Sequence, residues 1–300
     1  MRCRRHWALA CGFVLLMALG YARAAAAQSQ PWRSAEPQQP AAAVPEEQNP
    51  QRLPTPPAAP FQLSAAEQAQ LDSALQFWEQ RSAEVRVYEA KFRRWVYSSF
   101  GGNGEPIHVD DGSIYFEAPE KARFHVHSPK DRQEQWITDG QAVFHFDYRA
   151  SILREYPLPP ELRGQSIADG PLPFVFGAEA AALKQRYFLR LITPPDAKEQ
   201  VWIEAFPRFQ EDAANFARAE IVLSTRDWLP WGVHIYLPGD AQQGPGGNRH
   251  AYQFYEAKVN PPLGFLRGNP FRVATPLGWR RIVEQPEPQT TQRPATPERR

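Results

Sequence analysis

Apolar and polar residues alternate in short runs along most of the chain between residues 85 and 259. This period of two is typical of strands in a sheet that buries one face. The run at 85–97 shifts its phase near Tyr88, which predicts one strand with a bulge or a twist. Further strands are predicted at 113–117, 123–127, 135–138, 142–147, 152–156, 187–192, 201–206, 218–224, 230–237 and 251–259, with a last extended piece around 271–273.

A different period occurs ahead of these strands. Ser64 and Glu67 form a capping box, and Leu71, Leu75 and Trp78 follow at helical spacing, which predicts a helix over 65–82 with one apolar face. A second, short helix is predicted over 174–183, after a proline-rich loop at 157–177. The fold class is therefore α+β and mainly β, with about ten or eleven antiparallel strands and two to three helices.

Turn-forming residues connect several of the predicted strands. Asp139-Gly140 separates two alternating runs, which is typical of a tight hairpin with positive φ at the turn. Asp110-Asp111 precedes Gly112, and aspartates before a glycine favour a turn, because their side chains accept hydrogen bonds from backbone N–H groups. The alternative is a pair of carboxylates with an acid–base role.

The two ends of the chain have compositions that do not favour a packed core. Residues 1–27 combine arginines, an apolar run and small residues, which is the order of a cleaved secretory signal peptide; an uncleaved membrane anchor is the alternative. Residues 28–60 are rich in Pro, Ala and Gln, and 285–300 are similar, so both are expected to be disordered. One folded domain remains at 61–284, in an exported, periplasmic protein.

Charge and cysteine content exclude several partners. The chain has 34 basic and 33 acidic residues, and four of the arginines lie in 1–27, so the mature chain has 30 against 33, a formal charge of −3. A nearly neutral protein has no electrostatic attraction to nucleic acid, and we expect no more than transient contact with a membrane. Cys3 and Cys11 both lie in the signal segment, so the mature chain has neither a disulfide nor a cysteine-bound metal.

The chain contains no recognisable catalytic motif. A nucleophile elbow, a zinc-protease helix, a phosphate loop and a dinucleotide fingerprint are all missing, so we expect neither an enzyme nor a cofactor. His125 and His127 share one face of a strand and could bind a metal. Phe124 and Val126 occupy the opposite face, however, so the two histidines are expected to point to water and no metal site is predicted.

Several short motifs follow one another in a characteristic order. They are Gly112-x-Ile114-Tyr115, Ala118-Pro119, Phe124-His125, Ile137 to Gly140, Val143-Phe144-x-Phe146, Pro173-Phe174, Arg226-Asp227 and Phe271 to Trp279. In this order the chain resembles the LolA-like superfamily of periplasmic lipoprotein carriers. Within it, the chain is most similar to exported planctomycete proteins without an assigned activity. The carriers have an arginine where this chain has Ala118, so their latch on the helical lid is not expected here.

The resemblance implies a curved, half-barrel sheet closed by helices over an apolar cavity. It implies a ligand that is a lipid or a lipidated protein, a role in lipoprotein localisation, and binding without covalent change. The expected cavity and lid residues are apolar or aromatic: Leu71, Leu75, Phe92, Tyr115, Phe124, Trp136, Phe144, Phe146, Phe174, Phe176 and Trp202. The alternatives are an envelope interaction or sensing module with a filled pocket, which would meet a protein partner, and a hydrolase with an unrecognised site.

Overall fold

The computed structural model describes residues 59–99, 104–129, 132–160, 163, 179–239, 247–262 and 268–284. The predicted signal segment at 1–27, nearly all of the segment at 28–60, and the tail at 285–300 lie outside these ranges. The same is true of two expected lid residues, Phe174 and Phe176. The expectations for these parts of the chain remain predictions.

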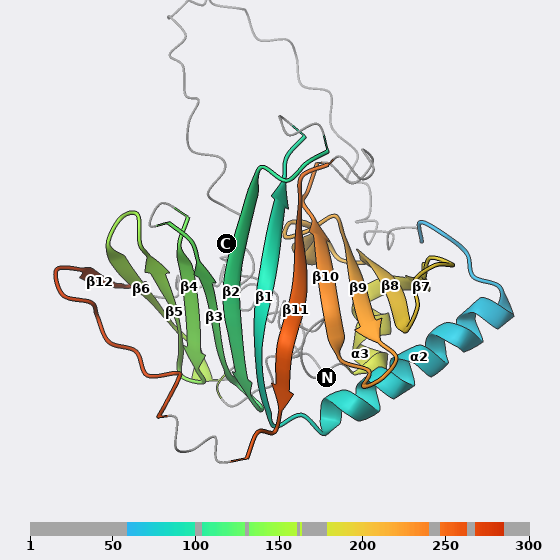
Figure 1. The fold of residues 1–300 in the computed structure, drawn as a ribbon, viewed down its shortest axis with the longest axis horizontal. Helices are drawn as coiled ribbons and strands as arrows, with labels where there is room; N and C mark the ends of the chain where they lie inside the picture. The colour runs from blue at the N-terminus through green and yellow to red at the C-terminus, as the bar shows by residue number, and fades with distance from the viewer. Residues whose placement is uncertain are drawn as a thin grey trace, which may run out of the picture.

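Twelve strands form one curved, open sheet (Figure 1). In chain order they are β1 (Val87–Tyr97), β2 (His108–Glu117), β3 (Lys121–His127), β4 (Glu134–Asp139), β5 (Ala142–Asp147), β6 (Ile152–Pro157), β7 (Tyr187–Leu191), β8 (Gln200–Pro207), β9 (Arg218–Ser224), β10 (Pro230–Tyr236), β11 (Arg249–Val259) and β12 (Arg280–Val283). Their order across the sheet is β12-β6-β5-β4-β3-β2-β1-β11-β10-β9-β8-β7. The expected fold class, mainly β with helices on an antiparallel sheet, is confirmed.

The sheet consists of two runs of neighbouring hairpins that meet in the middle. Strands β1 to β6 form one run and β7 to β11 the other, and β1 pairs with β11 where they join. The last strand, β12, returns to the far edge and pairs with β6 in parallel. This parallel pair is the one departure from the expected antiparallel sheet among the described strands.

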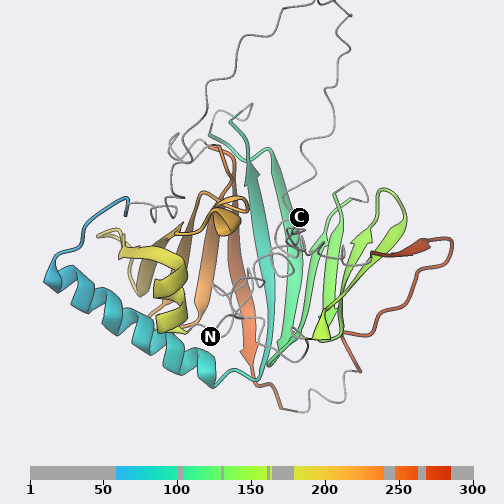
Figure 2. The ribbon, with the colours of Figure 1, turned by 180° about the vertical axis from the view of Figure 1, so that it is seen from behind.

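Three helices are described: α2 (Ala65–Ala83), α3 (Ala180–Arg186) and α4 (Gln210–Ala213). The predicted capping box starts α2, because Glu67 N–H donates to Ser64 Oγ at 3.3 Å and Ser64 N–H donates to Glu67 Oε2 at 2.8 Å. Figure 2 shows α2 and α3 on one face of the sheet, toward its β7 edge. None of the helices in the described part of the chain is long and apolar enough to span a bilayer.

The two faces of the sheet carry separate apolar cores. We call the face that α2 packs against the inner face; its core joins Leu71, Leu75 and Trp78 of α2 to side chains such as Phe92 and Ile221. On the opposite, outer face, Phe144 and Phe146 of β5 pack with Phe271 and Trp279 from the segment at 268–284. This C-terminal segment therefore covers the outer face of β4 to β6.

Most of the predicted strands occur within a few residues of their expected limits, and β5 and β9 occur with the expected limits. The bulge is in a different strand. Inner positions alternate without interruption along β1, whereas the register with β11 shifts between Glu89 and Lys91, where β11 contains the extra residue. Glu256, in this part of β11, has a φ of 54°. Of the two alternatives predicted for the strand at 85–97, a bulge or a twist, a bulge within that strand was therefore wrong.

Three further predictions of local structure differ from the fold. Asp110 and Asp111 do not form a turn but lie inside β2. The extended piece around 271–273 is not a strand, and the C-terminal strand is β12 instead. The predicted helix at 174–183 is described only from α3 onward, which starts at Ala180 and continues to Arg186. The one-turn helix α4 was not predicted, because a four-residue helix has no periodic pattern to detect.

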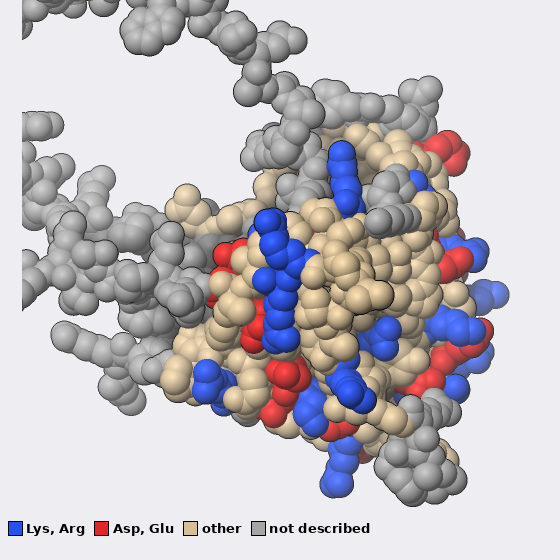
Figure 3. Space-filling model, turned by 90° about the vertical axis from the view of Figure 1, so that its left-hand side faces the viewer, with Lys and Arg blue, Asp and Glu red and all other residues tan. Residues whose placement is uncertain are grey.

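Ion pairs link the edge strand β12, and the residue that follows it, to β6. Arg154 Nη1 lies 3.0 Å from Glu284 Oε1, and Arg281 Nη2 lies 2.6 Å from Glu155 Oε2. Figure 3 views the molecule from this side and shows Lys and Arg side chains interspersed with Asp and Glu. Mixed charges of this kind make an edge strand a poor template for further strand pairing.

Candidate functional site

Aromatic side chains from the middle of the sheet, on β1, β3 and β11, meet on the inner face. The rings of Phe92 and Phe124 stack with centroids 4.8 Å apart and planes 8° apart. Tyr252 and Phe254 present their edges to Phe92, with centroids at 5.7 and 6.4 Å. We call Phe92, Phe124, Tyr252 and Phe254 the aromatic wall. Stacked and edge-on rings bury large areas and remain rigid, which suits a surface for hydrocarbon.

Gly112 of β2 makes room for this wall. It pairs with Phe92 across β1 and β2, and a Cβ built at this position would lie 2.2 Å from the Phe92 ring and 2.5 Å from the carbonyl oxygen of His125. Only glycine fits a strand at such a close approach. The glycine that suggested a turn is therefore explained by the ring across the strand pair.

The helix α2 lies over the β7 side of the inner face. Leu71, Leu75 and Trp78 are each at most 2% exposed and belong to the inner core. On its other side, Phe77 is 50% exposed and stacks on Trp228 in the turn before β10, with ring centroids 5.0 Å apart. Among the described elements, the helices pack chiefly against β7 and β8 rather than against β2 to β6.

A buried cluster of charges lies directly beside the aromatic wall. Arg94 follows Phe92 on the same face of β1, and its guanidinium lies 3.0 Å from Asp110 Oδ2 and 3.1 Å from Glu134 Oε2. Trp136 Nε1 donates to Glu134 at 2.8 Å, and Ser128 donates to Asp110. Burial alone would raise the pKa of Asp110, but the hydrogen bonds from Ser128 and Arg94 hold it below its ordinary value.

Two histidines on the inner face are held neutral by burial. Burial lowers the pKa of His250 to about 3, and the neighbouring charge of Arg94 acts in the same direction. Burial likewise lowers the pKa of His145 to about 4. The His145 ring stacks on Trp136, with centroids 3.9 Å apart. Both imidazoles therefore act as polar packing groups at neutral pH rather than as cations.

The residues expected to line one cavity are divided between the two faces. Leu71, Leu75, Phe92, Phe124 and Trp136 lie on the inner side. Tyr115, Phe144, Phe146 and Trp202 lie on the outer face, because strand alternation and cross-strand register place them opposite the inner residues. The two groups cannot line the same space, and Phe174 and Phe176 are outside the described residues.

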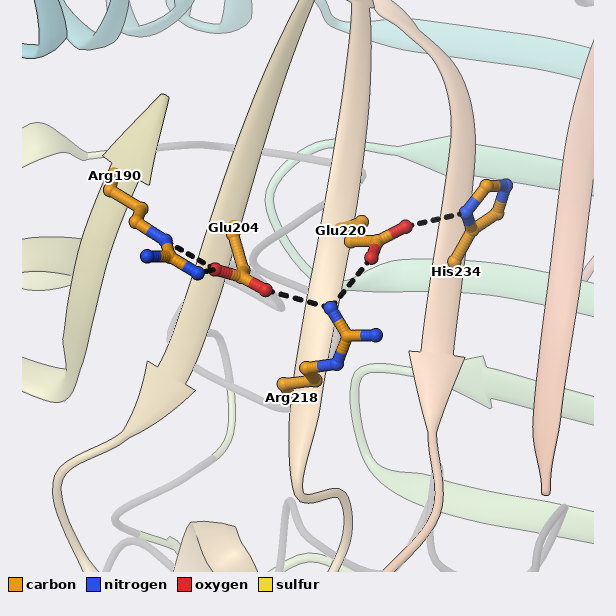
Figure 4. Close-up of polar contacts among 5 residues, drawn as sticks. All are labelled: Arg190, Glu204, Arg218, Glu220 and His234. Carbon is orange, nitrogen blue, oxygen red and sulfur yellow. Dashed lines mark hydrogen bonds and ion pairs between the residues drawn. The ribbon is translucent and has the colours of Figure 1, made fainter. Parts of the chain in front are cut away.

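A row of alternating charges crosses the outer face of β7 to β10 (Figure 4). Glu204 Oε2 lies 2.5 Å from Arg190 and Glu204 Oε1 lies 2.7 Å from Arg218. Glu220 continues the row, at 2.8 Å from Arg218 and 2.8 Å from His234 Nδ1. Burial raises the pKa of Glu220, but His234 and Arg218 outweigh burial and lower the pKa below its ordinary value. The row links four strands and leaves no unpaired charge among its members.

A shallow depression of about 290 Å³ lies on the outer face over β1, β2 and β11. Most of the residues that line it have polar or charged groups, although their apolar atoms supply much of the surface: Glu89, Lys91, Asp111, Ser113, Tyr115, His127, Tyr255, Glu256 and Lys258, with Ala90 and Gly112. His127 is exposed, as expected, whereas His125 is partly buried and contacts Gln133. No group of three or more metal-ligating side chains is present within the described ranges.

Sequence reasoning missed the charged groups of the inner face. Arg94 occurs at the same alternate positions of the strand as Tyr88, Ala90 and Phe92, and this position could have indicated that its side chain is buried. A cation in an apolar phase indicates a buried ion pair. At the latch position, Ala118 directly follows β2, and the nearby Arg123 lies on the outer face, so it does not face α2.

No family model matches the chain, and no curated protein matches it. Among solved structures, the chain is similar to an uncharacterized conserved protein from Thermus thermophilus, with a TM-score of 0.42 and 12% identity over 72% of this chain and 99% of that one. It is also similar to the LolA superfamily protein NE2245 from Nitrosomonas europaea (TM-score 0.33, 10% identity, 64% and 94% covered). A third similar structure is the lipoprotein LppX from Mycobacterium tuberculosis (TM-score 0.36, 12% identity, 64% and 97% covered).

Proposed function

We propose that this chain is an exported, carrier-like protein that binds a lipid, or the acyl chain of a lipidated protein, against the inner face of its sheet. One observation carries the proposal: the aromatic wall lies on a face over which the described helices pack chiefly at the β7 side. Movement of α2 would open apolar surface of the core that α2 shares with the aromatic wall. An apolar wall that ends at Arg94, Asp110 and Glu134 is complementary to an amphiphile.

The energy of such binding is sufficient for transport through water. Each buried methylene contributes roughly 0.8 kcal/mol, so a long acyl chain contributes on the order of 10 kcal/mol before ordering costs. Displacing α2 exposes Leu71, Leu75 and Trp78, at roughly 2 kcal/mol each. The two terms are similar in size, so a ligand can replace the helix without a large loss of stability.

A reversible cross-link tests whether α2 is the lid. Phe77→Cys and Trp228→Cys, with Cys3 and Cys11 replaced by serine, place two thiols where two rings now stack 5.0 Å apart. We expect a short, cleavable bifunctional thiol reagent to abolish uptake of a fluorescent fatty acid, and its cleavage to restore uptake. The Phe77→Cys variant alone, treated identically, is the control.

Two outcomes would contradict the proposal. Unchanged uptake in the cross-linked protein would show that α2 is not the lid. No uptake by the unmodified protein, with no acyl species in native mass spectra of protein purified from its own envelope, would favour the second candidate, an interaction or sensing module. The complete burial of Phe92 among its neighbours is the observation that supports that candidate.

Binding without covalent change is part of the proposal. Among the described residues, a serine and a histidine in contact, as in a serine hydrolase, are found at Ser113 and His127, with Oγ and Nε2 3.3 Å apart. The nearby Asp111 is paired with Arg93 at 2.8 Å, so it is not shown to orient the histidine as the acid of a catalytic triad does. A panel of ester, glycan and peptide substrates should therefore give no turnover. Turnover that disappears in Ser113→Ala would overturn this part of the proposal.

A further inference from the structure

Arg123 of β3 is an outer-face arginine without a carboxylate partner among the described residues. It lies between Tyr115 of β2 and Ile137 of β4. Its Nε is buried and has no hydrogen-bond partner among the described residues. Four outer-face arginines do have carboxylate partners within 3 Å: Arg93 with Asp111, Arg190 with Glu204, Arg218 with Glu220, and Arg281 with Glu155. A partly buried guanidinium without an anion is costly, which points to an external one.

Two imidazoles lie on the same face of β3, directly after Arg123. The rings of His125 and His127 are 4.3 Å apart and meet edge to face. His125 Nε2 lies 3.1 Å from the amide nitrogen of Gln133, so Nε2 accepts and Nδ1 carries the hydrogen. Burial lowers the pKa of both histidines, to about 4 for His125, and Arg123 adds to both shifts. At neutral pH the two imidazoles are therefore uncharged and Arg123 carries the positive charge of the group, while the carboxylate of Asp111 opposes the downward pKa shift of His127.

The depression next to this region has room for a ligand. Its volume is about 290 Å³, and Ser113, Tyr115 and His127 belong to its lining. The lysines in the lining are already paired, Lys91 with Glu256 at 2.6 Å and Lys258 with Glu89 at 3.3 Å. Asp111 is likewise engaged by Arg93. The rest of the depression is therefore polar but compensated, and it suits a hydroxyl-bearing group rather than a second charge.

We propose that Arg123, His125 and His127 bind the phosphate group of a phosphate ester whose polar remainder lies in the depression. The guanidinium fork donates to two phosphate oxygens, and the imidazoles donate to the third from the adjacent positions of β3. A tetrahedral oxyanion has enough acceptors for these donors. The site is on the face opposite α2, so it is independent of acyl binding on the inner face.

Affinity for phosphate should rise as the pH falls. A bound phosphate anion, mainly the monoanion near pH 5 and the dianion near pH 8, favours protonated histidine, so binding is linked to proton uptake by His125 and His127. Other titratable groups face the site from the neighbouring strands: Glu89 and Lys91 of β1, Asp111 and Tyr115 of β2, Glu256 and Lys258 of β11, and Tyr148 after β5. Of the side chains around the site, the imidazoles are those that ordinarily titrate between about pH 5 and pH 8.

Titration of the full chain with inorganic phosphate tests the proposal, using NMR signals of the histidine rings and calorimetry. We expect saturable binding that is about tenfold tighter near pH 5 than near pH 8, and a loss of about tenfold or more in Arg123→Gln. Arg123→Lys keeps the charge and should recover part of the loss. The matched control is Arg226→Gln, an exposed arginine paired with Glu199 at 2.5 Å, and it should bind like the unmodified protein.

A second variant keeps the test valid if Arg123→Gln folds poorly. His127 is exposed, so His127→Gln should retain the melting temperature and lose most of the pH dependence of binding. Vesicles of phosphatidylglycerol and soluble glycerol phosphate then distinguish a lipid headgroup from a free phosphate ester, and binding of either supports the site. Absence of saturable binding near pH 5, or equal affinity in Arg123→Gln and the unmodified protein, would overturn the proposal.

Discussion

Single residues with unusual surroundings define the inner face. Gly112 interrupts an apolar strand because the Phe92 ring occupies the space of its side chain. Arg94 occupies an apolar position because Asp110 of β2 and Glu134 of β4 face it on the same side of the sheet. In both cases the residue is explained by a partner far away in the sequence.

Replacing Gly112 by alanine should test the fit of the aromatic wall. The added methyl group would meet a backbone carbonyl at 2.5 Å as well as the Phe92 ring, so it cannot be relieved by a side-chain rotation alone. We expect Gly112→Ala to lower the free energy of unfolding by about 3 kcal/mol. Urea denaturation measures this, and Ser113→Ala, next in the chain but facing outward, should change it by less than about 0.5 kcal/mol. Equal stability of the two variants would show that Phe92 moves freely.

These same residues show where sequence reasoning failed. Asp110-Asp111-Gly112 has the composition of a turn, and nothing nearby in the chain reveals Arg94 or Phe92 as neighbours. The Asp139-Gly140 hairpin was predicted correctly, because its requirements are local: Gly140 has a φ of 87°, and Asp139 Oδ1 accepts from the backbone of Gln141 and Ala142. Local chemistry is readable from sequence, whereas a close tertiary contact is not.

At the scale of elements, the alternating pattern located strands but did not assign their faces. Phe124 of β3 and Phe144 of β5 are both aromatic strand residues, yet the first packs against the inner core and the second belongs to the outer core under the C-terminal segment. A sheet with apolar cores on both sides gives strands without a clear polar phase. This is why the expected cavity residues divided into two groups, and why the fold was easier to predict than the candidate site.

The C-terminal segment should be essential to the outer core. Phe271 is 4% exposed and packs on Phe144 and Phe146, so Phe271→Ala should cost about 3 to 5 kcal/mol of unfolding free energy. Leu277, in the same segment, is fully exposed, and Leu277→Ala should leave stability within about 0.5 kcal/mol. Thermal and chemical denaturation of both variants measure these changes in the free energy of unfolding. Similar losses would mean that the segment does not depend on Phe271 for its position.

At the scale of the whole molecule, buried neutral histidines should make the protein sensitive to mild acid. The folded-state pKa values of His145 and His250 are about 4 and about 3, below the ordinary value of 6.5. The unfolded chain therefore binds more protons as the pH falls below about 6.5, and the contribution to stability that is complete above this pH is lost on acidification.

We expect the free energy of unfolding to fall between about pH 6.5 and pH 4 by up to about 1.4 kcal/mol per pH unit for each of these histidines. Urea unfolding at several pH values measures the slope. His250→Gln should flatten it, whatever its effect on stability at neutral pH. His108→Gln, at an exposed position of β2, is the control and should keep the original slope. An unchanged slope in His250→Gln would show that this histidine is not buried in the neutral form.

The strand order also has a consequence for how the molecule assembles. Hairpins within β1 to β6 and within β7 to β11 join neighbours in the chain, but the β1–β11 and β6–β12 pairs close very long loops; Ile152 and its partner Arg280 are 128 positions apart. Closing a long loop costs conformational entropy, which slows the formation of these pairs. We therefore expect the two hairpin runs to form first and to pair with each other late in folding. Because β11 pairs with β1 and β12 pairs with β6, the chain after β6 is attached to the first run at two places, and the two halves would separate only if both strand pairs opened together.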